Sequence, residues 1–250
     1  MSILQLEGVS KVFGGLHALD SVDLAVEAGE IVGLIGPNGA GKTTLVNAVT
    51  GVFPVTHGRI TFDGRSLVGL KPHQISRLGV ARTYQVVQPF PDMTALENVM
   101  APATFAGGAR SVEEARRLAM DSLEFVGLEE SAEALASELT LAGRKRLELA
   151  KSLAMNPKVL LLDEVNAGLN PVEIDHALDL IRRIADRKIT IVIIEHLMKV
   201  VMSLCSRLVV LHHGAKIAEG TPQEITSDEN VIEAYLGKRY ARAQKDASRP

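Results

Sequence analysis

The stretch Gly36-Pro37-Asn38-Gly39-Ala40-Gly41-Lys42-Thr43-Thr44 fits the pattern G-x-x-x-x-G-K-[ST]. It lies between an apolar run that is typical of a strand, residues 31–35, and a run that is typical of a helix, residues 45–50. Glycines at these positions let successive backbone N–H groups point at phosphate oxygens, and the N-terminus of the following helix adds positive potential. The stretch therefore predicts a loop that binds the phosphates of a nucleoside triphosphate.

Two side chains of this loop carry the predicted chemistry. We expect Lys42 to reach the β- and γ-phosphates and the Thr43 hydroxyl to ligate magnesium. A glycine-rich turn before an ordinary helix would explain the glycines, but it would not explain a Lys-Thr pair at this offset.

Composition narrows the class of protein. With 250 residues, of which 46% are hydrophobic, the chain can form one large core, or a core with an inserted lobe. The net charge of −3 and the lack of a basic stripe argue against nucleic acid as a partner. A single cysteine, Cys205, excludes an internal disulfide and a cysteine-rich metal site. No secretory signal and no apolar run of about 20 residues is present, so we expect a cytoplasmic protein.

Hydrophobic patterning predicts a mixed α/β protein. Alternating runs predict an antiparallel β-region, and continuous apolar runs predict buried parallel strands. The alternating runs are residues 3–9, 22–26 and 58–62; the continuous runs are residues 159–162, 189–194 and 208–211. Helical spacing is found at residues 94–100, 111–126 and 142–154. We therefore expect a nucleotide-binding core with an inserted helical lobe.

The expected domain organisation follows from these patterns. One domain covers residues 1–237, with its core in residues 1–88 and 154–237 and its helical part in residues 89–153. The basic segment 238–250 is expected to be a flexible, solvated tail, although it could also touch a membrane surface or a partner.

Acidic and imidazole side chains follow two of the apolar runs. Asp163 and Glu164 come directly after residues 159–162, and carboxylates at the end of an apolar strand seldom lack a partner. We expect Asp163 to hold magnesium through its hydration shell and Glu164 to polarise the attacking water. A helix-capping role or a surface ion pair is the structural alternative. His196, after residues 189–194, could contact the γ-phosphate, although a strand-end histidine taken alone is more often structural.

The order of these motifs resembles that of the ATP-binding-cassette ATPases. The phosphate loop, Gln85, the segment 139–150, Leu162-Asp163-Glu164 and His196 follow one another as in that family, and the resemblance covers about residues 4–236. It implies a P-loop NTPase core with a mixed sheet, an antiparallel β subdomain and an inserted helical subdomain. It also implies that the cofactors are ATP and Mg²⁺ and that the reaction is ATP hydrolysis.

Shorter stretches resemble the nucleotide-binding subunit of branched-chain amino acid importers more narrowly. They are residues 13–16, 81–85, 90–99, 167–171, 195–199 and 234–237. The resemblance implies import of branched-chain or other hydrophobic amino acids. An exporter of lipid or lipopolysaccharide is an alternative within the superfamily. A soluble ATP-dependent switch acting on ribosomes or DNA is another alternative, but such relatives usually carry two cassettes or a long coiled-coil insertion.

The resemblance assigns roles to further residues. Phe13 corresponds to the aromatic side chain that stacks on adenine, although a core phenylalanine is the alternative. Gln85 corresponds to the glutamine whose amide meets magnesium or the attacking water. Residues 88–93 would help to form a groove for a short helix of a membrane subunit, with Phe90 and Met93 as apolar contacts.

The segment that follows Leu139 departs from the family's usual Leu-Ser-Gly-Gly-Gln. Thr140 keeps a hydroxyl at the serine position, whereas Leu141, Ala142 and Gly143 replace the two glycines and the glutamine. The resemblance implies that Thr140, Ala142 and Gly143 contact the ATP of a partner subunit. The extra methyl of Ala142 could hinder close approach to the γ-phosphate.

The expected partners follow from the same resemblance. They are a second ATPase subunit, identical or related, in a head-to-tail pair, and transmembrane permease subunits. A solute-binding protein would act indirectly. The chain would then lie on the cytoplasmic face of the inner membrane.

Overall fold

The computed structural model describes residues 2–236, which form two compact units. The first unit runs from the N-terminus to Gly69 and resumes at Val192; the second spans Leu70–Ile191. The expected tail, residues 238–250, and Gly237 lie outside the described residues. The division into a core, residues 1–88 and 154–237, and a helical part, residues 89–153, stays a prediction.

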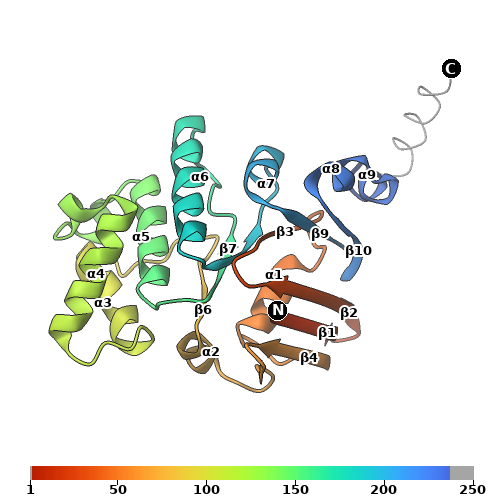
Figure 1. Cartoon of the computed structure of the whole chain (residues 1–250), viewed down its shortest axis with the longest axis horizontal. Coiled ribbons are helices and arrows are strands. Elements are labelled where there is room, and N and C mark those ends of the chain that lie inside the picture. The colour runs from red at the N-terminus through yellow and green to blue at the C-terminus, as the bar shows by residue number, and fades with distance from the viewer. Residues whose placement is uncertain (1, 237–250) are drawn as a thin grey trace. The chain divides into compact units, whose positions relative to one another are not determined.

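Alternating apolar residues build an antiparallel sheet in the first unit. Strand β1 (Ser2–Phe13) pairs with β2 (Leu16–Glu27) and β4 (His57–Phe62), and β4 also pairs with the short β5 (Arg65–Ser66). Apolar side chains at every second position, such as Leu4 and Leu6, are buried, which is the pattern of a sheet with one covered face. The expected antiparallel region is therefore present (Figure 1).

Continuously apolar strands form a mixed sheet in the same unit. Strand β3 (Ile31–Ile35) pairs in parallel with β9 (Arg207–His212), and β10 (Ala215–Gly220) pairs antiparallel with β9. Strand β8 (Thr190–Ile194) contains the boundary between the two units. The helices of the first unit are α1 (Lys42–Val49), α7 (Met198–Leu204), α8 (Pro222–Ser227) and α9 (Glu229–Leu236).

An arginine fork joins the start of β9 to the residue before β3. Arg207 donates from Nε to Glu30 Oε1 (2.8 Å) and from Nη2 to Glu30 Oε2 (2.9 Å), and it also contacts Glu219 on β10. Hydrogen bonds from Arg207 hold the pKa of the Glu30 carboxyl below its usual value of 4.5. A carboxyl with a lowered pKa stabilises the fold above its ordinary pKa, and this contribution disappears as the pH falls through the lowered value.

We expect Arg207→Gln to lower the free energy of unfolding at pH 7 by about 1–2 kcal/mol, after allowance for solvent screening of this half-buried pair. The difference should shrink as the pH falls below about 4.5, where Glu30 of the unfolded chain takes up a proton, and it should be lost below the lowered pKa of Glu30 in the folded protein. Urea unfolding at several pH values measures both the loss of unfolding free energy and its dependence on pH. Arg59→Gln, in the exposed pair of Arg59 with Glu7, is the control and should change little. A pH-independent difference for Arg207→Gln would contradict the electrostatic explanation.

The second unit combines a parallel strand pair with a group of helices. Strand β6 (Val80–Arg82) pairs in parallel with β7 (Val159–Asp163). Helices α3, α4 and α5 contact one another and form a bundle that Figure 1 shows in yellow-green. The helices of this unit are α2 (Pro72–Leu78), α3 (Ala95–Phe105), α4 (Val112–Val126), α5 (Leu141–Leu153) and α6 (Pro171–Asp186), with the 3₁₀ turns η1 (Glu129–Ser131) and η2 (Ala136–Glu138).

Polar caps define where these helices begin. Thr94 and Ser111 precede α3 and α4, and each side chain accepts a hydrogen bond from the backbone N–H three residues later. Helix α3 is longer than the predicted helical run 94–100, because it continues to Phe105 with Pro102 inside it. A proline inside a helix removes one backbone hydrogen bond, and the burial of Ala103 next to it helps to offset that cost.

These elements confirm the predicted fold class, an α/β protein with a mixed sheet, an antiparallel sheet and a helical segment. None of the helices within residues 2–236 has both the length and the hydropathy that crossing a bilayer requires.

Candidate functional site

The glycine-rich loop joins β3 to α1 in the first unit, in the predicted strand-loop-helix context. Gly36 has φ of 149° and Gly41 has φ of 105°, values that favour glycine. A Cβ atom on Gly36 would lie 2.1 Å from the Leu211 carbonyl oxygen, and one on Gly41 would lie 2.7 Å from the Ala18 carbonyl oxygen. Only glycine fits at either position, so the loop can keep its tight backbone curve.

Hydrogen-bond donors gather where this loop meets α1. Lys42 Nζ donates to the carbonyl oxygens of Gly36 (2.7 Å) and Pro37 (3.0 Å), so its ammonium group lies over the loop. The N-cap residue, Gly41, offers no side-chain acceptor to the first N–H groups of α1. Thr43 is exposed in the first turn. A lysine and the N–H groups at a helix N-terminus suit phosphate, so the residues present fit a nucleotide.

Phe13 lies at the end of β1 with 44% of its surface exposed. Its ring packs edge-to-face against Phe53, with 5.2 Å between centroids, and Lys11 Nζ lies 4.8 Å from its centroid. The alternative of a buried core phenylalanine therefore does not hold, and one part of the ring is open to contact.

His196 also belongs to the first unit. It is exposed and follows β8, with the buried Glu195 between them.

Burial and the nearby charge of Glu195 raise the pKa of the Cys205 thiol to about 12, so Cys205 stays protonated and unreactive.

Asp163 ends β7 in the second unit and forms a buried ion pair that the sequence analysis did not anticipate. Arg82 Nη2 donates to Asp163 Oδ2 at 2.7 Å, and both side chains are at least nine-tenths buried. The Asp163 N–H donates to Thr83 Oγ1 at 3.2 Å. Arg82 thus contacts one of the two carboxylate oxygens, Oδ2. In the sequence, the only indication of this pair was Arg82 itself, a charged residue at the end of a short apolar run, three positions before Gln85.

We expect Arg82→Met to destabilise the protein by about 3–5 kcal/mol, because it leaves the buried carboxylate of Asp163 without its cation. Adding Asp163→Asn should recover part of this loss, since no uncompensated charge then remains. Urea unfolding of the two single variants and the double variant measures the coupling. Arg116→Met, in an exposed pair with Glu133, is the matched control. Additive effects of the Arg82 and Asp163 substitutions would contradict the prediction.

Glu164 contacts Gln85 directly, although 79 residues separate them in the chain. Gln85 Nε2 donates to Glu164 Oε2 at 2.5 Å. The backbone of Glu164 has φ of 47°, in the left-handed region that is uncommon for glutamate. Such strain is typical of functional sites, where the surroundings impose it. Asp163, Glu164 and Gln85 are thus brought together in one unit, whereas the phosphate loop and His196 belong to the other.

The segment that departs from the family pattern begins α5. Thr140 Oγ1 accepts from the Gly143 N–H at 3.1 Å, so the threonine hydroxyl caps the helix. Ala142 is half-buried and Gly143 is buried. A Cβ atom on Gly168 would lie 3.1 Å from Leu141 Cδ2. Leu141, which replaces the first glycine of the family pattern, therefore lies against the turn that follows Glu164.

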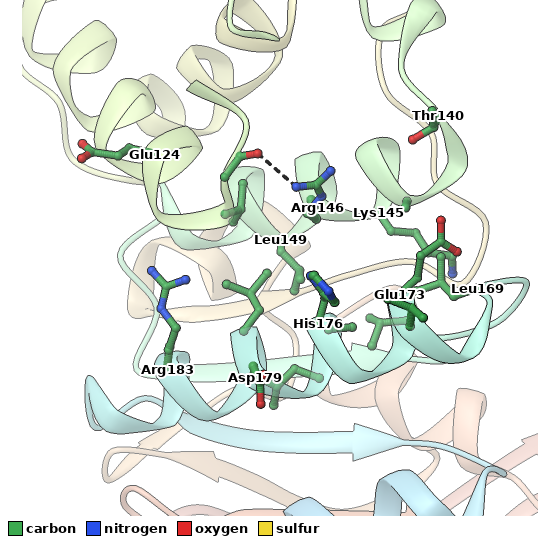
Figure 2. Close-up of a pocket in the computed structure, with 18 residues that line it drawn as sticks. Glu124, Thr140, Lys145, Arg146, Leu149, Leu169, Glu173, His176, Asp179 and Arg183 are labelled. Carbon is green, nitrogen blue, oxygen red and sulfur yellow. Dashed lines mark hydrogen bonds between the residues drawn. The ribbon is translucent and has the colours of Figure 1, made fainter. Parts of the chain in front are cut away.

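A cavity of about 660 Å³ lies beside this segment, between α5 and α6. Figure 2 shows Lys145 of α5 and the cap residue Thr140 on one side of it and Glu173 and His176 of α6 on the other. Charges of both signs line it, with apolar side chains such as Leu149 between them.

Tyr235 contacts the phosphate loop. It lies in the stretch 234–237, which resembles the branched-chain importer subunits in sequence. Its phenol is hydrogen-bonded to the backbone of Gly36, and burial raises its pKa above the usual value. Helix α9 therefore touches the first residue of the loop.

Comparison with known proteins decides the family. The protein-family model described as "ABC transporter" matches residues 19–167, which is more than half of the chain. The chain belongs to the ABC transporter family. A second model, "Branched-chain amino acid ATP-binding cassette transporter", matches residues 215–241.

Relatives of this ABC protein match it along nearly its whole length. The high-affinity branched-chain amino acid transport ATP-binding protein BraF of Pseudomonas aeruginosa is 42% identical and covers 94% of this chain and 98% of its own. LivG of Escherichia coli, which carries the same description, is 40% identical with the same coverage. A solved ABC transporter cassette, MJ1267 in its ADP conformation, has a TM-score of 0.85 and 31% identity, over 95% of this chain and 100% of that chain. The chain is thus an ATP-binding cassette, an ATPase of a transporter.

Proposed function

We propose that this cassette is the ATPase subunit of an importer of branched-chain or other hydrophobic amino acids. The observation that carries the proposal is the identity of 42% with BraF, a branched-chain amino acid transport protein, across 94% of the chain. The match of residues 215–241 to a branched-chain amino acid cassette model supports it further.

The phosphate loop is proposed to bind ATP. Residues 36–44 would surround the phosphates, with Lys42 at the β- and γ-phosphates, and the partly exposed Phe13 would stack on adenine. The contacts of Lys42 with Gly36 and Pro37 support this role, because they hold its ammonium group at the loop that would receive the phosphates.

Thr43, Gln85 and Asp163 are proposed to hold Mg²⁺. Thr43 is exposed at the start of α1, and the hydroxyl, amide and carboxylate oxygens of these three side chains are ligands that suit a hard cation. When bound, the cation would neutralise charge that develops on the phosphoryl oxygens.

Glu164 is proposed to orient the attacking water and accept its proton. The contact between Gln85 and Glu164 supports this, because the amide fixes one carboxylate oxygen in place. His196 would contact the γ-phosphate, and Lys42 would stabilise the charge that develops during in-line attack.

A second cassette is proposed to complete each site. The N-terminal amides of α5, with Thr140, Ala142 and Gly143, would face the ATP of a partner subunit, which is identical or related to this one. The cassette MJ0796, 27% identical over 88% of this chain, was solved as a dimer bound to ADP and Pi, with a TM-score of 0.78.

The loop before α3 is proposed to dock on permease subunits at the cytoplasmic face of the membrane. Asn98 is fully buried, accepts from the Phe90 N–H (2.8 Å) and donates to the carbonyl oxygens of Phe90 (3.0 Å) and Thr94 (2.9 Å). This bracing holds Phe90, with 54% of its surface exposed, and the half-buried Met93 three positions later on the same loop. Exposed aromatic side chains on a fixed loop suit a protein interface.

Uptake by proteoliposomes tests the proposal. The cassette would be reconstituted with its permease subunits and its solute-binding protein, with ATP inside the vesicles, and uptake of labelled leucine, isoleucine and valine would be measured. ATP-dependent uptake that excess unlabelled leucine abolishes would support it. Lipid movement in place of amino acid uptake would favour an exporter. A cassette that binds no membrane protein would favour a soluble switch.

A further inference from the structure

The backbone at Glu164 needs external support. A glutamate with φ of 47° is strained, yet this residue must place its carboxylate within hydrogen-bonding distance of a water molecule. Its carbonyl oxygen accepts from the Ala167 N–H at 3.1 Å, which closes a turn directly after β7. Its carboxylate accepts from Gln85.

A second donor to this carbonyl comes from α5. Lys145 Nζ lies 3.4 Å from the Glu164 carbonyl oxygen, and Lys145 is buried, with 8% of its surface exposed. Lysine is rarely buried unless its ammonium group has partners, so its placement beside this turn is specific. Figure 2 shows Lys145 extending from α5 toward the α6 side of the cavity, near Leu169.

The same helix carries the segment that is proposed to face the partner's nucleotide. Helix α5 begins at Leu141, directly after its cap Thr140, and Lys145 follows little more than one turn later. One turn rises about 5.4 Å, and a hydrogen-bonded helix moves as a unit over that distance. A shift of the N-terminus of α5 would therefore displace Lys145 Nζ, and with it the donor to the Glu164 carbonyl.

We infer that Lys145 is a positioning residue that links the N-terminus of α5 to Glu164 of the same chain. By donating to the Glu164 carbonyl oxygen, Lys145 fixes the strained backbone that aims the carboxylate. Docking of a partner's nucleotide on α5 would then be transmitted to Glu164. The inference rests on the proposed role of Glu164 in hydrolysis.

Three variants of the full-length cassette test this inference. Lys145→Met removes the donor while keeping side-chain volume, and Lys145→Arg restores a cationic donor. Lys151→Met is the matched control, because it removes another largely buried lysine of α5, whose ammonium group pairs with Glu148 at 2.6 Å. Each is assayed for MgATP hydrolysis, thermal unfolding, and hydrogen exchange of residues 160–170 without nucleotide.

We expect Lys145→Met to lower kcat roughly 10- to 100-fold, with little change in KM for ATP, since a small displacement of a catalytic group has effects of that size. Lys145→Arg should recover most of the activity. Exchange at residues 164–167 should be faster in Lys145→Met and close to wild type in Lys145→Arg. Lys151→Met should lower the Tm but leave kcat and this exchange unchanged.

Two results would overturn the inference. One is unchanged exchange at residues 164–167 in Lys145→Met. The other is a loss of activity that Lys151→Met reproduces, because the effect would then come from general destabilisation of α5. Failure of the proposed function has a different result, namely hydrolysis by Glu164→Gln at the wild-type rate.

Discussion

Replacing Glu164 with glutamine is expected to lower kcat for ATP hydrolysis by about 10²–10⁴-fold, the usual contribution of a general base. The amide cannot accept the proton of the attacking water, but its oxygen can still accept from Gln85 Nε2, so the local structure should persist. ATP binding should be retained. With MgATP, the variant should therefore accumulate as a nucleotide-bound dimer, measured by light scattering beside a phosphate-release assay.

Glu133→Gln is the control for this experiment. Glu133 forms an exposed ion pair with Arg116, so the same chemical change there should leave hydrolysis and assembly as in the wild type. Wild-type turnover by Glu164→Gln would contradict the role proposed for this carboxylate. A Glu164→Gln variant that binds MgATP but stays monomeric would indicate that a related, not identical, cassette completes the pair.

Replacing Gly36 with alanine is expected to abolish ATP binding and to cost about 3 kcal/mol or more of stability. The new methyl would lie 2.1 Å from the Leu211 carbonyl oxygen, a backbone atom that cannot move without disturbing β9. It would also displace the Gly36 carbonyl that accepts from Lys42, and the backbone that Tyr235 contacts. Overpacking and left-handed strain each cost about 1–3 kcal/mol, so their sum is large. Urea unfolding and fluorescent-nucleotide titration measure the two effects.

Gly64→Ala separates steric overlap from backbone strain. Gly64 has φ of 75°, also in the left-handed region, but a Cβ atom there would meet nothing within 4 Å. It lies in the turn between β4 and β5, away from the phosphate loop. We expect a loss of about 1–2 kcal/mol and normal ATP binding. If Gly36→Ala and Gly64→Ala lost the same free energy of unfolding, backbone strain alone, and not the contact with Leu211, would explain the effect at Gly36.

Local sequence patterns were enough for most of the fold. The strand before the phosphate loop was predicted as residues 31–35, which are the bounds of β3, and the helical run 111–126 differs from α4 by one residue. These predictions rest on the side-chain period of strands and helices and on capping, which act over a few neighbouring residues. The extension of α3 past Pro102 was missed, because tertiary packing offsets a local penalty there.

The candidate site also has a part that local sequence patterns indicate and a part that depends on tertiary packing. The strand-loop-helix context of the loop glycines, Lys42 and Thr43 was predicted from adjacent residues, and the position of the two acids from the end of an apolar strand, whereas the roles of these residues stay predictions. The role of Thr140 as a cap of α5 also needed only its neighbours, although the expected role was contact with nucleotide.

Pairing between distant side chains was decided by the tertiary structure alone. Arg82 meets Asp163 across 81 residues, and Lys145 meets the Glu164 carbonyl across 19. Neither contact has a sequence signature, because it depends on how β6, β7 and α5 pack and on which polar groups that packing buries. Burial then makes a partner obligatory, since a charged group without one would cost several kcal/mol. The sequence by itself thus determined the elements and the chemistry at the strand ends, and packing determined which charges hold that chemistry in place.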